Sequence, residues 1–245
     1  MTMGASVPRD VQEFLDGYPG LHDDLSQSDN LKFYSNELKC QPDRKLISEI
    51  HEEWFGQYSL LEAKHGYIQW LFPIREYGLN YAAQPLQKHE IEAMKGDETI
   101  GRRLLASYQL MLDFFGMRLE NESTGLISRS TNYEASYKNL RRSPHNNLRI
   151  SRILKCLSEF GYEHLNYGFL LHVLNEQSEH GQLNTSFIRS SMDRWWANCI
   201  RKDRERVWIG GKIASVRTQG ADEPFVFTRE MYEAAIDTWT NEGRL

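Results

Sequence analysis

Long apolar runs are missing from this 245-residue sequence, and no window approaches the ~18 consecutive apolar residues of a membrane span. No basic segment followed by an apolar one marks a secretory signal at the N-terminus. Cysteine is scarce, because Cys40, Cys156 and Cys199 are widely spaced and form no C-x-x-C pair. This usage favours buried thiols in a reducing, intracellular compartment over a disulfide framework. We therefore expect a soluble chain without a transmembrane span.

An excess of positive charge is missing as well. The sequence has 29 basic and 34 acidic residues, so the formal net charge is -5. Proteins that bind nucleic acid usually carry a basic surface. Global charge therefore gives no indication of nucleic-acid binding, and such a role would need a local basic patch.

The short sequence signatures of enzymes are missing too: there is no G-x-S-x-G, phosphate-binding loop or G-x-G-x-x-G. His172, Glu176 and His180 are spaced by four and could line one helical face, as a divalent metal site requires. Gly181 ends that helix and the spacing lacks H-E-x-x-H, so we expect a solvated face without a metal. The sequence indicates no cofactor and no catalytic residue. A helical enzyme without recognisable motifs ranks third among the candidate functions.

Helical periodicity is abundant. In residues 97–115 the apolar side chains recur at steps of three and four, behind a capping Asp97 and in front of Gly116. A further helix is expected over 60–72, where Pro73 must end it. Similar stripes follow the capping-box spacing at 131–134, Asn146-Asn147, Thr185 and position 228. These patterns predict an all-α fold, a single globular multi-helix domain of about eight to ten helices.

Strand patterns are scarce. Residues 207–216, VWIGGKIASV, alternate around two glycines and predict a small β-hairpin. We expect the helical domain at 30–204, after an N-terminal extension at 1–29. The C-terminal extension, 205–245, would hold the hairpin and a final helix. The domain is expected to fold cooperatively without residues 1–29 and 220–245.

One stretch, YIQWLFPIREYGLNY at 67–81, turns sharply. Trp70 lies off the apolar stripe of its helix, and the loop after the proline is rich in aromatic and polar residues. One interpretation is a structural lock. Arg75 would bind helix-end carbonyls, Asn80 would bond to its own turn, and Trp70 would pack against a neighbouring helix.

The amino-acid sequence of this stretch is distinctive. The segment HGYIQWLFPIREYGLNY at 65–81 strongly resembles the opioid growth factor receptor family. The resemblance extends through NLKFY (30–34), YSLLEAKH (58–65), RRLLASYQLMLDFFGMRL (102–119) and HNNLRISRILKCL (145–157), and covers about 30–204. It implies the conserved N-terminal domain of that family, a non-enzymatic binding domain unrelated to seven-helix opioid receptors. Animal members continue into long, repeat-containing C-terminal tails, which are absent up to Leu245.

The resemblance also implies a ligand, a role and a location. The family is described as a receptor for an enkephalin-type peptide, restrains proliferation, and is nuclear or perinuclear; we expect a cytoplasmic or nuclear protein. A second interpretation of the corner follows, in which it forms a peptide pocket. A peptide that begins with tyrosine has a free amine and a free carboxylate, which would need a carboxylate, a cation and an aromatic face. The candidate ligand-binding residues are Trp70, Arg75, Glu76, Asn80 and Tyr81.

A basic segment stands out in this acidic protein. Between positions 135 and 158 there are six basic residues and no acidic one: Lys138, Arg141, Arg142, Arg149, Arg152 and Lys155. The candidate anion or partner surface comprises Arg141, Arg142, His145, Asn146, Asn147, Arg149 and Arg152, at the start of a helix whose amides attract anions. The alternative is a solvated face paired with acidic helices. If the surface is functional, the second-ranked function is an intracellular scaffold that binds protein or nucleic acid through 138–155.

Overall fold

The computed structural model describes residues 7–218 and 225–241. In this part of the chain there are thirteen α-helices, one 3-10 helix and a single two-stranded sheet. The bounds up to the sheet are α1 Arg9–Leu15, α2 Asp29–Tyr34, α3 Ile47–Trp54, α4 Tyr58–Ala63, α5 Tyr67–Leu71, α6 Lys88–Lys95 and α7 Glu98–Phe114. The strands and later helices are β1 Met117–Asn121, β2 Leu126–Arg129, α8 Tyr133–Arg142, α9 His145–Glu159, α10 Glu163–Ser178, α11 Ser186–Arg194, η1 Trp196–Asn198, α12 Asp203–Arg217 and α13 Arg229–Asn241. The predicted all-α class with a small hairpin is confirmed, although the helices outnumber the predicted eight to ten.

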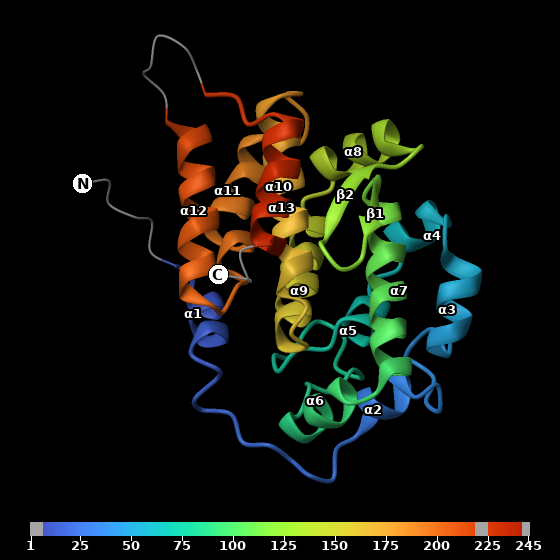
Figure 1. Cartoon of the computed structure of the whole chain (residues 1–245). Coiled ribbons are helices and arrows are strands. Elements are labelled where there is room, and N and C mark those ends of the chain that lie inside the picture. The colour runs from blue at the N-terminus through green and yellow to red at the C-terminus, as the bar shows by residue number, and fades with distance from the viewer. Residues whose placement is uncertain (1–6, 219–224, 242–245) are drawn as a thin grey trace.

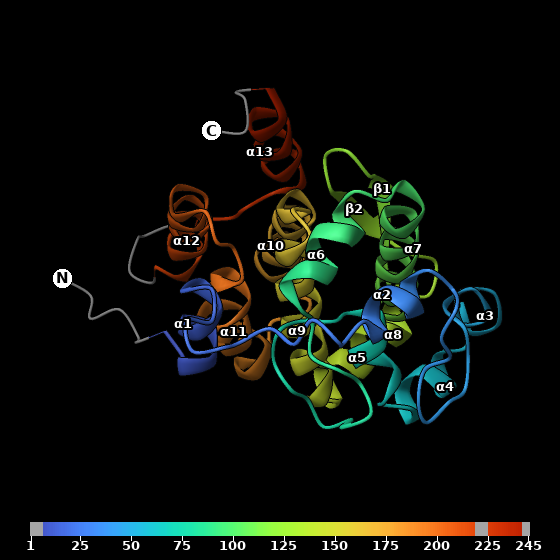
Figure 2. The same ribbon diagram turned by 90° about the horizontal axis from the view of Figure 1, so that it is seen from below.

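Helix α10 forms the centre of the molecule. Nearly all of its residues are buried, and it packs against α9, α12, α13 and β2. Figure 1 shows α11 and α12 on one side of α9 and α10, with α7 and α3 on the other. Seen from below, α5 and the loop after it lie against α9 (Figure 2). A helix that is buried all round must be covered from every side, and the surrounding elements provide that cover.

Two predicted helix starts are confirmed by their caps. The Asp97 side chain accepts hydrogen bonds from the amides of Thr99 (2.7 Å) and Ile100 (3.1 Å) at the start of α7. The Thr185 hydroxyl accepts one from the amide of Ile188 at 3.2 Å, which starts α11. Both caps are local, because the capping atom and the free amides lie within one turn.

Two other predicted helix starts are wrong. The capping box at 131–134 does not form, because α8 begins at Tyr133 after Asn132, whose side chain makes no capping bond. Helix α9 begins earlier than the predicted Asn146-Asn147 cap, since Pro144 occupies its N-cap position and both asparagines lie inside the helix. Proline suits this end of a helix because the first amides have no partner inside the helix anyway.

The hairpin predicted at 207–216 is wrong, because these residues belong to α12. The segment also fits a helical period, because Ile209 and Ile213 are four residues apart and both buried, in line with the buried Glu205 one turn earlier. The hairpin lies at β1 and β2 instead, with Leu119 opposite Ile127.

The prediction of a single helix over 60–72 is also wrong. Two helices, α4 and α5, occupy this region, and positions 64–66 separate them. Gly66 lies close to an earlier loop, since a Cβ atom there would be 2.8 Å from Pro42. Contact with this distant segment therefore interrupts an apolar pattern that would otherwise continue as one helix.

The C-terminal helices pack on the same core as the rest of the chain. Tyr232, Ile236 and Trp239 of α13 are buried, and the Trp239 ring lies 4.1 Å from that of Tyr167 in α10. The domain boundary at 204 stays a prediction. It falls between α10 and α13, whose buried side chains contact each other. Within the described ranges, no helix combines the length and apolarity needed to cross a bilayer.

Candidate functional site

A cavity of about 320 Å³ opens where the loop after α5 meets α9. We call it the corner cavity. It is lined by Asp10, His65, Ile68, Gln69, Ile74, Glu76, Tyr77, Gly78, Leu79, His145, Leu148, Arg149, Ser151, Arg152 and Lys155. Its volume falls in the range of small-ligand sites. The fold thus brings Glu76 of the predicted corner together with His145, Arg149 and Arg152 of the predicted basic surface.

A buried lysine ties three segments together in the wall of this cavity. The Lys155 ammonium lies 2.7 Å from Glu76 Oε1 and 3.1 Å from Asp10 Oδ2, and its side chain is only 3% exposed. Burial alone would lower the pKa of Lys155, but the adjacent Glu76 carboxylate holds it above its usual value. The Tyr18 hydroxyl also donates to Glu76 Oε1, at 2.7 Å. Two carboxylates therefore share one ammonium in this wall, while the other two cations of the lining, Arg149 and Arg152, donate to main-chain carbonyls.

The two arginines of α9 hold the ends of shorter helices. Arg149 donates to the carbonyls of Leu61 (2.9 Å) and Lys64 (2.7 Å), at the C-terminal end of α4. Arg152 Nε donates to the carbonyl of Phe72 at 2.8 Å, just after α5. Burial lowers the pKa of Arg152 to about 10. Both guanidinium groups therefore act as helix caps that also line the cavity.

Four of the five predicted corner residues do not line the cavity, and three of these four make contacts within the fold. Trp70 is buried, and its Nε1 donates to the carbonyl of Gln41 at 3.0 Å. The Asn80 amide donates to the same carbonyl at 2.6 Å and to that of Gly66 at 3.0 Å. The buried Arg75 pairs with Asp23 at 3.1 Å. These contacts favour the lock interpretation, with two differences: the partner of Arg75 is a carboxylate, and the donor bonds of Asn80 reach other segments.

The rim of the cavity is apolar and exposed. Tyr77, Leu79 and Leu148 line it and are 74%, 90% and 70% exposed. Tyr81, a predicted ligand residue, is 86% exposed but does not line it. Sequence reasoning missed these rim residues as well as Asp10. A signal existed for Leu148, which is a large apolar residue off the buried stripe of its helix.

The rest of the predicted basic surface is divided between burial and solvent. The buried Asn146 donates to Glu62 Oε2 at 3.1 Å, and His145 Nε2 lies 2.9 Å from Glu62 Oε1. Arg141 donates to Gln182 at 2.5 Å, and Arg142 is exposed. Asn147 is buried in the wall of a second hollow between α9 and α11. Most of the predicted anion surface is therefore already engaged within the chain.

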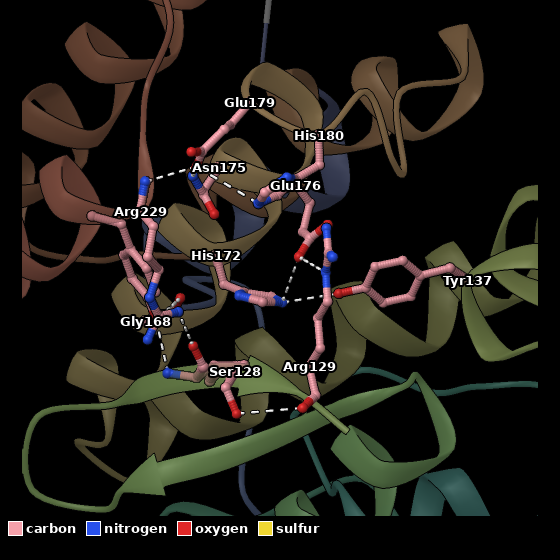
Figure 3. A network of polar contacts seen from close by, with 12 residues as sticks. Ser128, Arg129, Tyr137, Gly168, His172, Asn175, Glu176, Glu179, His180 and Arg229 are labelled. Atoms are coloured by element: carbon pink, nitrogen blue, oxygen red, sulfur yellow. Dashed lines mark hydrogen bonds and ion pairs between the residues drawn. The ribbon is translucent and has the colours of Figure 1, made fainter. Parts of the chain in front are cut away.

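The expectation of a solvated face at His172 and Glu176 is wrong, because both are at most 2% exposed. Arg129 of β2 donates to both carboxylate oxygens of Glu176 at 2.7 Å (Figure 3). The Tyr137 hydroxyl lies 3.0 Å from His172 Nε2, and burial lowers the pKa of His172 to about 3. The fold supplies the countercharge that a buried carboxylate needs. No group of three metal-binding side chains occurs among the described residues.

Comparison with known proteins decides the family. A sequence model of the "Opioid growth factor receptor (OGFr) conserved region" matches residues 23–229. The chain belongs to the opioid growth factor receptor family. This match contains every residue of the corner cavity except Asp10, and also the Asp23–Arg75 pair.

Relatives in this family are substantially longer. The opioid growth factor receptor of Rattus norvegicus is 41% identical over 205 residues, which is 82% of this chain and 35% of that protein. The Homo sapiens receptor is 46% identical over 158 residues, covering 64% of this chain and 23% of its own length. Opioid growth factor receptor-like protein 1 of Rattus norvegicus is 40% identical over 200 residues, 81% of this chain and 42% of that protein. The chain thus spans about a third of the rat receptor. No solved structure shows a significant match.

Proposed function

We propose that this chain is a non-enzymatic binding domain that holds an enkephalin-type peptide in the corner cavity. The observation that carries the proposal is the pairing of two carboxylates that share one lysine with an apolar rim, in one cavity of ligand size. The names of the relatives, opioid growth factor receptors, support a peptide as the ligand.

The chemistry of such a peptide fits this cavity. Its N-terminal ammonium would bind beside Glu76 and Asp10, where two carboxylates share one lysine. Its tyrosine ring would be covered by apolar side chains of the lining such as Ile68, Ile74 and Leu79. The cavity accommodates the first residue or two, and the remainder of the peptide would pass over Leu148.

Binding should be measured by isothermal titration calorimetry with a peptide that begins with tyrosine and with its analogue lacking the amino group. Loss of a charged hydrogen bond of ~1.5–3 kcal/mol should weaken binding by about 10- to 100-fold. Leu79→Ser should weaken it by about tenfold through the lost apolar contact. Tyr81→Ser is the matched control, because it is equally exposed in the same loop but does not line the cavity. Absence of binding by the folded wild-type chain, or equal losses for both variants, would reject the proposal.

A role in growth regulation and a cytoplasmic or nuclear location belong to the same proposal. The family membership supports both, and the three cysteines are buried free thiols, as suits a reducing compartment. A fluorescent fusion and a proliferation assay with the Leu79→Ser and Tyr81→Ser pair would test them together. If neither variant changes proliferation while peptide binding differs, the regulatory role does not depend on this cavity.

A further inference from the structure

A second hollow lies on the other side of Leu148. This α9–α11 groove has a volume of about 410 Å³ and is lined by Pro144, His145, Asn147, Leu148, Ser151, Phe187, Ser190, Ser191 and Trp195. Phe187 is 62% exposed although it is a large apolar residue. The two small serines of α11 leave the space open between the larger side chains. Exposed apolar residues that converge on one hollow are typical of sites that bind another molecule.

An exposed arginine, Arg194, stands beside the lining of this groove. Phe187, Ser190 and Arg194 follow the i, i+3, i+7 spacing and therefore share one face of α11. The guanidinium of Arg194 lies 4.8 Å from the ring of Trp195 in the groove wall, and among the described residues it has no acidic partner. The neighbouring Asp193 is already paired with Arg217 at 2.9 Å.

A second exposed arginine is close in sequence to the groove lining. Arg142 is exposed, precedes the groove residue Pro144 by two positions, and has no hydrogen-bond or ion-pair partner within the described ranges. Asn147 in the wall is 5% exposed, and its amide lacks a hydrogen-bond partner among the same residues. A bound main chain would offer the N–H and C=O groups that complement such an amide.

We propose that the α9–α11 groove docks an acidic amphipathic peptide segment of a partner protein. Its apolar side chains cover Phe187, Leu148 and Trp195, and its carboxylates pair with Arg194 and Arg142. This site adjoins the corner cavity, with which it shares His145, Leu148 and Ser151, whereas Phe187, Ser190, Ser191 and Trp195 line the groove and not the cavity. A nucleic acid fits less well, because phosphate contacts need a row of cations and this lining is mostly apolar.

The partner class can be tested by fluorescence polarisation with the whole chain. The probe is a labelled amphipathic 15-residue peptide of Leu, Phe and Glu; the comparison ligands are the same peptide with Lys for Glu, its scrambled form and a single-stranded oligonucleotide. Phe187→Ser and Arg194→Glu should each weaken binding of the acidic peptide by about tenfold or more. Arg189→Glu, on the opposite face of α11, and Val207→Ser, an exposed position on α12, should leave it unchanged.

Steric filling separates this proposal from the peptide cavity. Ser190→Trp should block the acidic peptide, while the tyrosine-first peptide keeps its affinity for the corner cavity. The proposal is overturned if the acidic peptide does not bind, if its lysine or scrambled forms bind equally well, or if the oligonucleotide binds better with the same dependence on Phe187. A concentration-dependent dimer that Phe187→Ser dissolves would also overturn it, because a second copy would then cover the groove.

Discussion

At the scale of single residues, two glycines allow α10 and the hairpin turn to approach closely. Gly125 has a φ of +77°, a conformation that side chains disfavour, and it brings its carbonyl against Gly168. A Cβ atom at Gly168 would lie 1.7 Å from the Gly125 oxygen. This approach explains a glycine in the middle of a long buried helix, where it would otherwise cost ~1 kcal/mol relative to alanine.

Gly168→Ala should therefore destabilise the fold, because the hairpin must move away from α10. Overpacking of this kind costs ~1–3 kcal/mol, measured as the free energy of unfolding in urea. Gly211→Ala in α12 is the control: apart from its chain neighbours and the backbone of its own helix, no described atom lies within 4 Å of its Cβ position, so the greater helix propensity of alanine should stabilise the fold by ~0.5–1 kcal/mol. Equal effects of the two substitutions would contradict the close contact.

The individual residues of the corner could be predicted only in part. Asn80 was expected to bond to its own turn, and its Oδ1 does accept from the amide of Ala82 at 3.1 Å. Its two donor bonds reach Gln41 and Gly66, which no local pattern reveals. The pair of Arg75 and Asp23 could not be predicted either, because two opposite charges 52 positions apart (75 minus 23) leave no signal in a single sequence.

At the scale of elements, α9 shows why the basic segment was predicted as an anion surface. No acidic residue occurs between positions 135 and 158, but Arg149 binds the end of α4, Arg152 the end of α5 and Lys155 an acid of α1. The charges are needed because carbonyls at helix ends have no partner inside their own helix. Local charge counting detects the cations but not these distant acceptors.

Helix boundaries were likewise predictable where local contacts set them and unpredictable where distant contacts do. Those set by a local cap, such as Asp97 of α7, could be read from the sequence. The helical structure of 207–216 could not be read in this way. Its glycines and branched residues suit a hairpin, and only the packing of Ile209 and Ile213 against the core selects the helix. The start of α8 was also missed: the box at 131–134 places the cap at Thr131, whereas Asn132 occupies the N-cap position and its side chain bonds to the carbonyl of Asp113 at 3.3 Å.

The ion pair between β2 and α10 makes a prediction at this scale. Arg129→Ala would leave the buried Glu176 carboxylate without its countercharge, which should destabilise the fold by ~3 kcal/mol. Denaturation monitored by circular dichroism would measure it. Adding Glu176→Met to the alanine variant should recover much of the loss, because the isolated charge is removed. Arg118→Ala, in an exposed pair on β1, is the control and should cost less than ~1 kcal/mol. A small effect of Arg129→Ala would mean that water or another cation compensates Glu176.

At the scale of the whole molecule, the candidate site forms where segments that are distant in the sequence meet. The corner and the basic segment were both predicted, but as separate sites, and their junction requires α5 and α9 to be adjacent. Asp10 comes from a segment that was expected to be dispensable, and its carboxylate lies 3.1 Å from Lys155. Sequence patterns thus identified several lining residues, whereas the cavity depends on contacts between distant segments.

The C-terminal helix gives the last prediction, which concerns folding as a unit. Tyr232 of α13 is fully buried; its hydroxyl accepts from the amide of Ile127 at 2.8 Å and donates to the carbonyl of Gly168 at 3.2 Å. Removing residues 220–245 would expose the apolar surface that α13 covers on α10 and leave these backbone groups unpaired. We expect the shortened chain to lose several kcal/mol of stability, by the burial energy of three large side chains.

The point variant Tyr232→Phe tests the mechanism without truncation. It keeps the ring but removes both hydrogen bonds, so it should lower the free energy of unfolding by ~1–3 kcal/mol. Met231→Ser, at a half-exposed neighbouring position on the same helix, is the matched control and should be nearly neutral. A cooperative, unchanged melting transition of the chain lacking 220–245 would instead support the boundary expected from the sequence. In that case α13 would be an accessory helix, because α10 and the hairpin would keep their contact without the bonds to Tyr232.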